Sequence, residues 1–362
     1  MLQKKLIGLQ WLRAMAALMV VMAHNHDFLL KHGMEFYDGW IGGIGVDIFF
    51  IISGYVMFGL MDGLPQGRRE AYIFAAKRIG RIVPIYWLVI LSVILVWQIT
   101  GNDLFSGMNH YFRTSRVVKN LLFLDANPIV GVGWTLAYEM FFYLLSGVAI
   151  LAITRNSTRL LAISLTLAAL VLVGIVAEYT GRIVGNPLIL EFAAGGLIWF
   201  LLNKFGDRLP PHVGIMTALA GLAGMVMLYG HHDYNHGHPY WFAASFLFVF
   251  GIMMAEPYFM RMRWRGPVAL GDASYFLYLV HFYVIITVTG LLFDVFHVTP
   301  GLAPALFATI MIMAITCTLS LLGHVYLERP LSRYVTGHLL RPLRWTARGR
   351  SDDRQAGQPL PL

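Results

Sequence analysis

The first apolar segment of the chain carries two ionisable residues, Arg13 and His24, within a stretch long enough to cross a membrane. Their eleven-residue separation, at 100° per residue, returns to within about 20° of the same helix face and rises roughly 16 Å. Ionisable side chains inside a membrane span are costly and normally face a protein interior or a watery cavity. One helix face therefore offers a cation near one membrane surface and a proton acceptor deep inside.

Further ionisable residues interrupt later apolar segments: Asp47, Glu139, Glu191 and His281. A charged side chain that faces lipid costs about 2.5–3.5 kcal/mol on insertion scales, so we expect these groups to meet one another, or water, inside a helix bundle. For Glu191 and His281, two interpretations stay open: hydrogen bonding between helices, and a functional role. For Asp47 and Glu139 the functional interpretation is favoured.

Helical spacing places polar side chains of two segments in stripes. Residues three or four apart lie on the same helix face, and each stripe follows this spacing over about two turns. We therefore expect each stripe to face the interior of the bundle. The stripes are Ser274, Tyr278 and His281, and Thr135, Glu139 and Tyr143.

A basic pair, Arg78 and Arg81, stands just before another apolar segment. The planar guanidinium group is well suited to binding phosphate. Lysine and arginine also collect at the cytoplasmic membrane surface for reasons of topology. By composition alone, topology explains this pair better than phosphate binding does.

Composition identifies the 362-residue chain as an integral membrane protein, since 58% of its residues are hydrophobic and only 13% are charged. The net charge of +8 reflects topology and does not indicate a nucleic-acid partner. The single cysteine, Cys317, excludes an intramolecular disulfide. We predict an all-α bundle of about ten spans: 6–30, 41–61, 82–100, 131–153, 159–180, 187–203, 212–230, 240–257, 270–293 and 303–326.

The distribution of positive charge predicts the orientation of these spans. With the N-terminus in the cytoplasm, 21 of the 27 lysines and arginines fall in cytoplasmic segments, as the positive-inside rule requires. Ten spans then place both termini in the cytoplasm. We expect one transmembrane domain, residues 1–346, followed by a disordered cytoplasmic tail, 347–362. The longest outer connection, 101–130, is expected to hold a short interfacial helix near 116–124.

A histidine-rich segment, 231–238, lies in another outer connection. Zinc sites use three or four such ligands at defined spacings. The histidines here follow no regular ligand spacing, so we predict no metal site.

Six segments together resemble acyltransferase family 3, a family of integral membrane acyltransferases. Each is a weak signal alone, but all six occur in the order typical of the family over roughly residues 8–334. The short chain and its sixth span resemble the exopolysaccharide O-acetyltransferase-like members most. The segments are LRAMAALMVVMAH (12–24), GVDIFFIISGYVM (45–57), RIGRIVPIYW (78–87), WTLAYEMFFY (134–143), GDASYFLYLVH (271–281) and YLERPLSR (326–333).

The resemblance implies a function and assigns roles to residues. It implies about ten spans and the transfer of an acyl group, usually acetyl from acetyl-CoA, to a hydroxyl of a sugar or lipid-linked glycan. It favours a functional role for Arg78 and Arg81 over the topological explanation of this pair, because both residues match the family's Arg-x-x-Arg motif. The other matched motif positions are Arg13, His24, Asp47, Trp134 and Glu139.

From the resemblance we expect acetyl-CoA to enter from the cytoplasm as a co-substrate, with no permanently bound cofactor. Its phosphates would be held by Arg78, Arg81 and Arg13. His24 would act as general base, oriented by Asp47 or Glu139. A covalent acyl-enzyme on His24, Ser274 or a tyrosine stays open. Residues expected to support the site or bind the acceptor are Trp134, Tyr138, Glu191, Ser274, Tyr278 and His281.

A transporter is the competing class of function. Ten spans with buried charges and glycine-interrupted helices also suit an exporter or flippase of lipid-linked sugars, although no inverted repeat is visible. The expected partners of the enzyme are acetyl-CoA, a polysaccharide or lipid-linked oligosaccharide, and membrane lipids, with no nucleic acid. The expected location is the bacterial inner membrane, with multiple passes.

Overall fold

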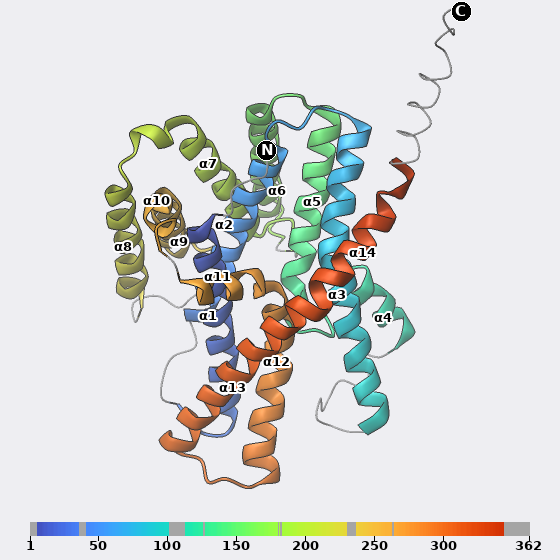
Figure 1. Cartoon of the computed structure of the whole chain (residues 1–362), viewed down its shortest axis with the longest axis vertical. Helices are drawn as coiled ribbons and strands as arrows, with labels where there is room; N and C mark the ends of the chain where they lie inside the picture. Colours follow the sequence, from blue (N-terminus) through green and yellow to red (C-terminus); the bar gives the residue numbers. More distant parts are fainter. Residues whose placement is uncertain are drawn as a thin grey trace, which may run out of the picture.

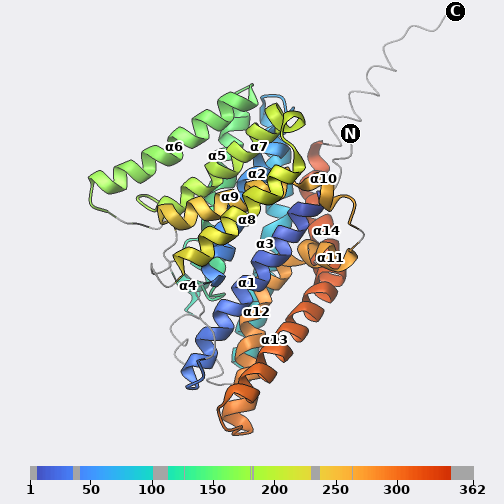
Figure 2. The same ribbon diagram turned by 90° about the vertical axis from the view of Figure 1, so that its left-hand side faces the viewer.

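The structure, a computed structural model, describes residues 6–35, 41–100, 113–125, 127–179, 181, 183–229, 237–262 and 264–343. Within these residues the fold is a bundle of helices without strands. Helix α1 (Ile7–Lys31) runs through the middle. Figure 1 shows α7 to α10 on one side of α1 and α3 to α5 on the other, and Figure 2 shows α12 and α13 running beside it.

The predicted all-α fold is confirmed, and each of the ten predicted spans corresponds to a helix. These helices are α1, α2 (Ile41–Met61), α3 (Arg68–Thr100), α5 (Gly133–Ala152), α6 (Asn156–Val176), α7 (Leu190–Phe205), α8 (Pro211–Leu228), α9 (Pro239–Met254), α12 (Ser274–Thr289) and α13 (Leu302–Gly323).

Shorter helical pieces join these spans. The predicted helix near 116–124 is present as α4, and π-helical turns η5 and η6 extend α12 and α13. The tail predicted at 347–362 lies outside the described residues. The pieces are α4 (Thr114–Leu121), η3 (Pro187–Ile189), η4 (Gly206–Arg208), α10 (Glu256–Phe259), α11 (Arg265–Asp272), η5 (Gly290–Val295), η6 (His324–Glu328) and α14 (Arg329–Leu339).

Helix lengths depart from the prediction in two places. Nine helices of the described chain are long and apolar enough to cross a membrane, but α9 has 16 residues and rises only about 24 Å, less than the roughly 30 Å hydrocarbon layer. Helix α3 has 33 residues and begins well before the predicted start at residue 82. The basic stretch before the apolar segment contains no proline, so the helix continues through it and carries Arg78 and Arg81 on its surface.

Small residues allow α1 and α2 to pack closely. Ala16 and Ala17 of α1 are completely buried. A Cβ atom added to Gly45 of α2 would lie 2.5 Å from the backbone oxygen of Ala16, a distance that forces the helices apart. The absence of a side chain at Gly45 therefore fixes the register in which α2 meets α1.

Segments predicted to lie in the cytoplasm gather at one end of the bundle. The Glu256 carboxylate accepts hydrogen bonds from the backbone amides of Ile7 and Gly8 at 2.6 and 2.8 Å, which satisfies free donors at the start of α1. Burial raises the pKa of Glu256, and the two amides offset part of that rise. At the same end, the Tyr72 hydroxyl donates to the backbone oxygen of Leu339 at 2.6 Å. This grouping agrees with the alternation of the predicted spans.

A buried arginine, Arg159, ties three helices together at this end. Its side chain near the start of α6 is completely buried. The guanidinium donates to the backbone oxygen of Met61, the last residue of α2, and to that of Ile153, the C-cap of α5, each at 2.8 Å. A positive charge at helix C-termini is favourable because the free carbonyls and the helix dipole are both negative there.

Replacing Arg159 with methionine should lower the stability of the protein by about 3 kcal/mol, because two charge-assisted hydrogen bonds are lost and the backbone oxygen of Met61 keeps only the Leu64 amide, at 3.2 Å, as a donor. The measurement is the Tm of the purified protein in detergent. Arg155→Met, at an exposed arginine four residues earlier, is the matched control. Equal melting of both variants and the wild type would contradict this role of Arg159.

Candidate functional site

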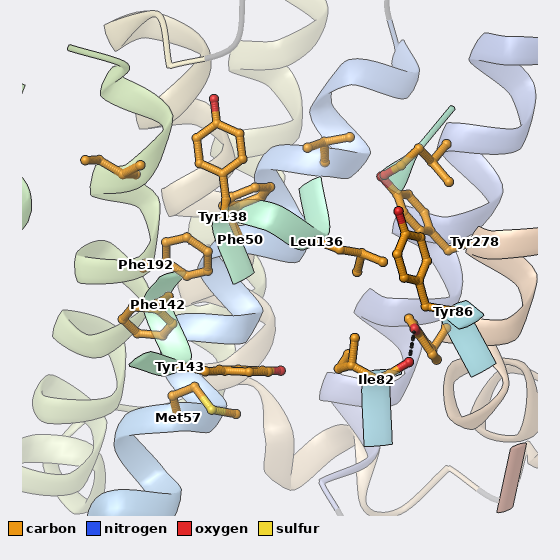
Figure 3. Packing of buried hydrophobic residues seen from close by; sticks show 14 of the residues in the cluster. Phe50, Met57, Ile82, Tyr86, Leu136, Tyr138, Phe142, Tyr143, Phe192 and Tyr278 are labelled. Carbon is orange, nitrogen blue, oxygen red and sulfur yellow. Dashed lines mark hydrogen bonds between the residues drawn. The ribbon is translucent and has the colours of Figure 1, made fainter. Parts of the chain in front are cut away.

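A cavity of about 260 Å³ lies between α1, α2, α3, α5, α7 and α12. Val46 and Met57, eleven residues apart on α2, both line it, so it extends about 16 Å along that helix. Figure 3 shows Phe50, Phe142 and Phe192 gathered on one side, with Tyr143 pointing away from them toward Ile82. The polar side chains that line the cavity are Gln10, Arg13, Ser53, Arg78, Arg81, Thr135, Glu139, Tyr143, Ser274, Tyr275 and Tyr278.

Three arginines predicted from separate motifs share this cavity. Arg13 comes from α1, and Arg78 and Arg81 come from α3. The guanidinium carbon of Arg78 lies 5.9 Å from the centre of the Tyr143 ring, and its Nη1 atom is buried without a hydrogen-bond partner. A buried N–H group without a partner is costly, so this atom is placed to bind a ligand.

Glu139 is the one acidic residue among the described residues that line the cavity. It accepts hydrogen bonds from the hydroxyl of Tyr143 and, at 3.2 Å, from the hydroxyl of Ser53. The pair Glu139 and Tyr143 is the predicted i, i+4 stripe of α5. Among the lining residues, three guanidinium groups face this one carboxylate, while Glu328 and Asp272, outside the lining, also act on the charge of Arg13.

The two predicted polar stripes meet across the cavity. The hydroxyls of Thr135 and Tyr278 lie 2.8 Å apart, and Tyr278 also donates to the backbone oxygen of Val132 at 3.3 Å. Ser274 begins α12 and lines the cavity with its buried Oγ unpartnered. The convergence expected from helical spacing is thus present, with Thr135 and Tyr278 closing the end of the cavity away from Arg78.

Sequence reasoning missed further polar residues of this wall. Gln10 lies three residues before Arg13, on the same face of α1, and its buried Oε1 atom has no partner. The Ser53 hydroxyl donates to Glu139, and the Tyr275 hydroxyl donates to the backbone oxygen of Ile82 at 2.7 Å. The i, i+3 spacing from Arg13 is the signal that could have identified Gln10.

His24 lies beside the cavity and is not among the residues that line it. Its ring stacks on His281, with centroids 5.4 Å apart and planes at 24°. His281 is completely buried and contacts Tyr278, whose ring centre is 6.0 Å away. A row of rings therefore connects the cavity wall to His24, whose side chain is 32% exposed.

The remaining predicted residues lie outside the cavity wall. Asp47 of α2 and Glu191 of α7 are both completely buried and lie against each other. Trp134 packs edge-on against Tyr138 at 5.9 Å. The Tyr138 hydroxyl accepts a hydrogen bond from the side-chain amide of Asn186 at 2.8 Å. These contacts join α2 to α7 and α5 to the loop before η3.

Metal ligands do not cluster in this site. No group of three or more histidine, cysteine, aspartate or glutamate side chains able to hold a metal ion occurs among the described residues. Most of the histidine-rich segment 231–238 lies outside those residues. The cavity instead offers guanidinium, hydroxyl and amide groups, which bind phosphate and other oxygen-rich groups.

The chain matches the profile of one known protein family. The profile of a family described as "Acyltransferase domain" matches residues 6–323. The chain belongs to acyltransferase family 3. This confirms the resemblance drawn from six short segments. A family of polytopic membrane proteins and the nine long apolar helices found among the described residues together establish a multi-pass membrane protein.

Curated relatives agree with the family. The exopolysaccharide production protein ExoZ of Rhizobium meliloti (strain 1021) is 32% identical over 308 residues, 81% of this chain and 90% of that protein. The O-acetyl transferase of Shigella phage Sf6 is 28% identical over 66% of this chain and 73% of its own. The putative peptidoglycan O-acetyltransferase YrhL of Bacillus subtilis (strain 168) is 25% identical over 90% of this chain, which spans 54% of its length. No solved structure matches.

The contact between Thr135 and Tyr278 should couple α5 to α12 by about 1 kcal/mol, the net worth of a buried hydrogen bond. A double-mutant cycle with Thr135→Val and Tyr278→Phe, read out as the free energy of unfolding in detergent, measures that coupling. The pair Thr166→Val and Tyr278→Phe is the control, because the Thr166 hydroxyl is exposed and bonds within its own helix. A coupling no larger than that of the control would contradict the contact.

Proposed function

We propose that this protein is a membrane O-acyltransferase. It transfers an acetyl group from cytoplasmic acetyl-CoA to a hydroxyl of an exported polysaccharide or its lipid-linked precursor. The observation that carries the proposal is the cavity that joins Arg13, Arg78 and Arg81 inside a chain of an acyltransferase family. Buried positive charge with an unpartnered N–H group supports a phosphate-bearing substrate.

The dimensions of the cavity favour one part of the donor. Its volume of about 260 Å³ lies below the roughly 300–1,000 Å³ that enclose a drug-sized ligand, so a whole acyl-CoA does not fit. A narrow space about 16 Å long suits the linear arm that carries the thioester. Arg78 and Arg81 then hold the phosphates at the cytoplasmic end, and the free polar atoms of Gln10 and Ser274 serve the amides of the arm.

His24 is the proposed general base. Its partly exposed side chain supports approach of the acceptor from the opposite face. In the reaction, the acceptor hydroxyl gives its proton to His24 while its oxygen attacks the thioester carbonyl. The carbon–sulfur bond breaks, and the leaving thiolate takes the proton to give free CoA. Because Tyr278 and His281 stand between the cavity and His24, the side chain of Tyr278 must move for the two substrates to meet.

The other predicted residues have supporting roles in this proposal. Glu139 limits the positive charge of the cavity, and Asp47 with Glu191 holds α2 against α7. A covalent acyl-enzyme remains the alternative route, with Ser274 and Tyr278 on the cavity wall as candidate carriers. The positive-inside pattern of the sequence supports the bacterial inner membrane as the location.

The class of acceptor is proposed from the names of relatives. ExoZ is named an exopolysaccharide production protein, and YrhL a putative peptidoglycan O-acetyltransferase. We place this chain with the former because the identity is higher and the coverage of both chains is nearly complete. Glycan mass spectrometry of cells with and without the protein tests this, with one acetyl increment as the expected difference.

Replacing both Arg78 and Arg81 with alanine should weaken acetyl-CoA binding at least tenfold, because two charge-assisted phosphate contacts are lost.

His24→Ala should bind acetyl-CoA normally but lose turnover by 10²-fold or more. Calorimetry of acetyl-CoA binding and the release of free CoA measure the two effects. Arg68→Ala with Arg69→Ala, at exposed arginines of the same helix, is the matched control. Near-normal turnover of His24→Ala would disprove the base assignment.

Glu139→Gln should tighten the binding of CoA by several-fold at low ionic strength. Glutamine still accepts the hydrogen bonds of Tyr143 and Ser53, but the negative charge that opposes the three arginines is gone. Calorimetry with CoA at two salt concentrations measures this, and the gain should shrink in high salt. Unchanged or weaker binding would show that CoA phosphates do not occupy the arginine cavity.

A transporter would give a different set of results. Movement of a lipid-linked sugar across vesicles containing the purified protein, with no consumption of acetyl-CoA, would favour a flippase. Acetyl-CoA consumption that depends on Arg78 and Arg81 favours the enzyme. The described helices bring polar residues together around one cavity, which suits a binding site for a reacting group.

A further inference from the structure

The carboxylate that the structure places beside His24 is Asp27, one helical turn further along α1. The Nδ1 atom of His24 lies 3.7 Å from Oδ2 of Asp27. We infer that Asp27 is the residue that positions His24 for proton transfer. This inference rests on the proposed function, in which His24 is the general base.

The contact defines which ring nitrogen reacts. A carboxylate at Nδ1 favours the tautomer with a proton on that atom, and Nε2 is then the nitrogen that accepts a proton. The distance of 3.7 Å is longer than a hydrogen bond, but catalytic hydrogen bonds in substrate-free sites are often long and tighten when substrate binds. An i, i+3 pair on one helix needs only a change of side-chain rotamer to close this gap.

Two neighbouring rings of α12 contact the ring of His24. His281 stacks on it, and Phe282 packs edge-on with its ring centre 5.7 Å away. The Nδ1 atom of His281 lies 3.3 Å from the backbone oxygen of Leu277, and its Nε2 atom is buried without a partner. The ring of His24 is therefore packed against His281 and Phe282, with the Asp27 carboxylate near its Nδ1 atom.

The other acidic residues considered from sequence have different partners. Asp47 lies against Glu191, in the interior between α2 and α7. Glu139 accepts hydrogen bonds from Tyr143 and Ser53 in the arginine cavity. The second titratable neighbour of Asp27 is His26, whose Nδ1 atom lies 3.6 Å from its other carboxylate oxygen. Among the charged groups described around His24, Asp27 is the one in reach of its ring nitrogen.

The solvent exposure of the Asp27 side chain determines how strongly its loss should lower kcat. Its side chain is 61% exposed, so water screens its charge and the pair is weaker than the buried aspartate–histidine pair of a hydrolase. We therefore expect loss of the carboxylate to lower kcat about tenfold, rather than the roughly 10⁴-fold seen when a buried triad aspartate is changed.

The test compares the kinetics of Asp27→Asn and Asp27→Glu with the wild type, using acetyl-CoA and polysaccharide isolated from cells that lack the protein. Asp27→Asn should lower kcat about tenfold with an unchanged KM for acetyl-CoA and an unchanged Tm. Asp27→Glu should restore most of kcat. In a His24→Ala background, Asp27→Asn should cause no further loss.

Asp294→Asn is the matched control. Asp294 is also an exposed aspartate beside a histidine, with Oδ1 3.3 Å from Nε2 of His32, and this change should leave kcat unaltered. A wild-type kcat for Asp27→Asn would overturn the inference, as would a parallel loss of Tm and donor binding. If the wild type itself releases no CoA from acetyl-CoA, the proposed function fails and the role of Asp27 fails with it.

Discussion

The structure depends on the cost of placing charge in a membrane. Arg13, Arg78 and Arg81 belong to helices that cross an apolar layer, and a guanidinium that faces lipid is strongly disfavoured. The bundle turns all three toward one cavity, where Glu139 supplies the single opposing charge among the described lining residues. Outside the lining, Glu328 and Asp272 also act on the charge of Arg13. The guanidinium groups need these carboxylates, water or an anion beside them, and this need supports the proposed binding of a phosphate-bearing substrate.

Helix α1 organises both halves of the site. It carries Gln10 and Arg13 on the cavity wall, and His24 with Asp27 about three turns further along. Its middle is lined with alanine, including the fully buried Ala16, which lets α2 pack against it. The same helix therefore sets the distance between the anion-binding end and the imidazole, and close packing holds that distance fixed.

A row of aromatic rings separates these two halves. Tyr278 lines the cavity and contacts His281, which stacks on His24. In the proposed function, such a barrier would keep the thioester away from water until the acceptor is present, and so prevent hydrolysis of the donor. Tyr278 is held in place by the Thr135 hydroxyl and the backbone oxygen of Val132, so opening of the barrier costs two hydrogen bonds.

The sequence by itself determined the helical fold, the family, the three arginines and the two polar stripes that place Glu139 with Tyr143 on one helix and Ser274 with Tyr278 on another. These features follow from hydrophobic length and helical period, which are local properties of the chain. Only the tertiary structure decided that Thr135 meets Tyr278, that Asp47 meets Glu191, that Ser53 joins the cavity wall, that α9 is short, and that His24 lies outside the cavity. Which helix faces meet depends on the volumes of side chains on neighbouring helices, such as the missing side chain of Gly45, and no periodicity within one helix contains that information.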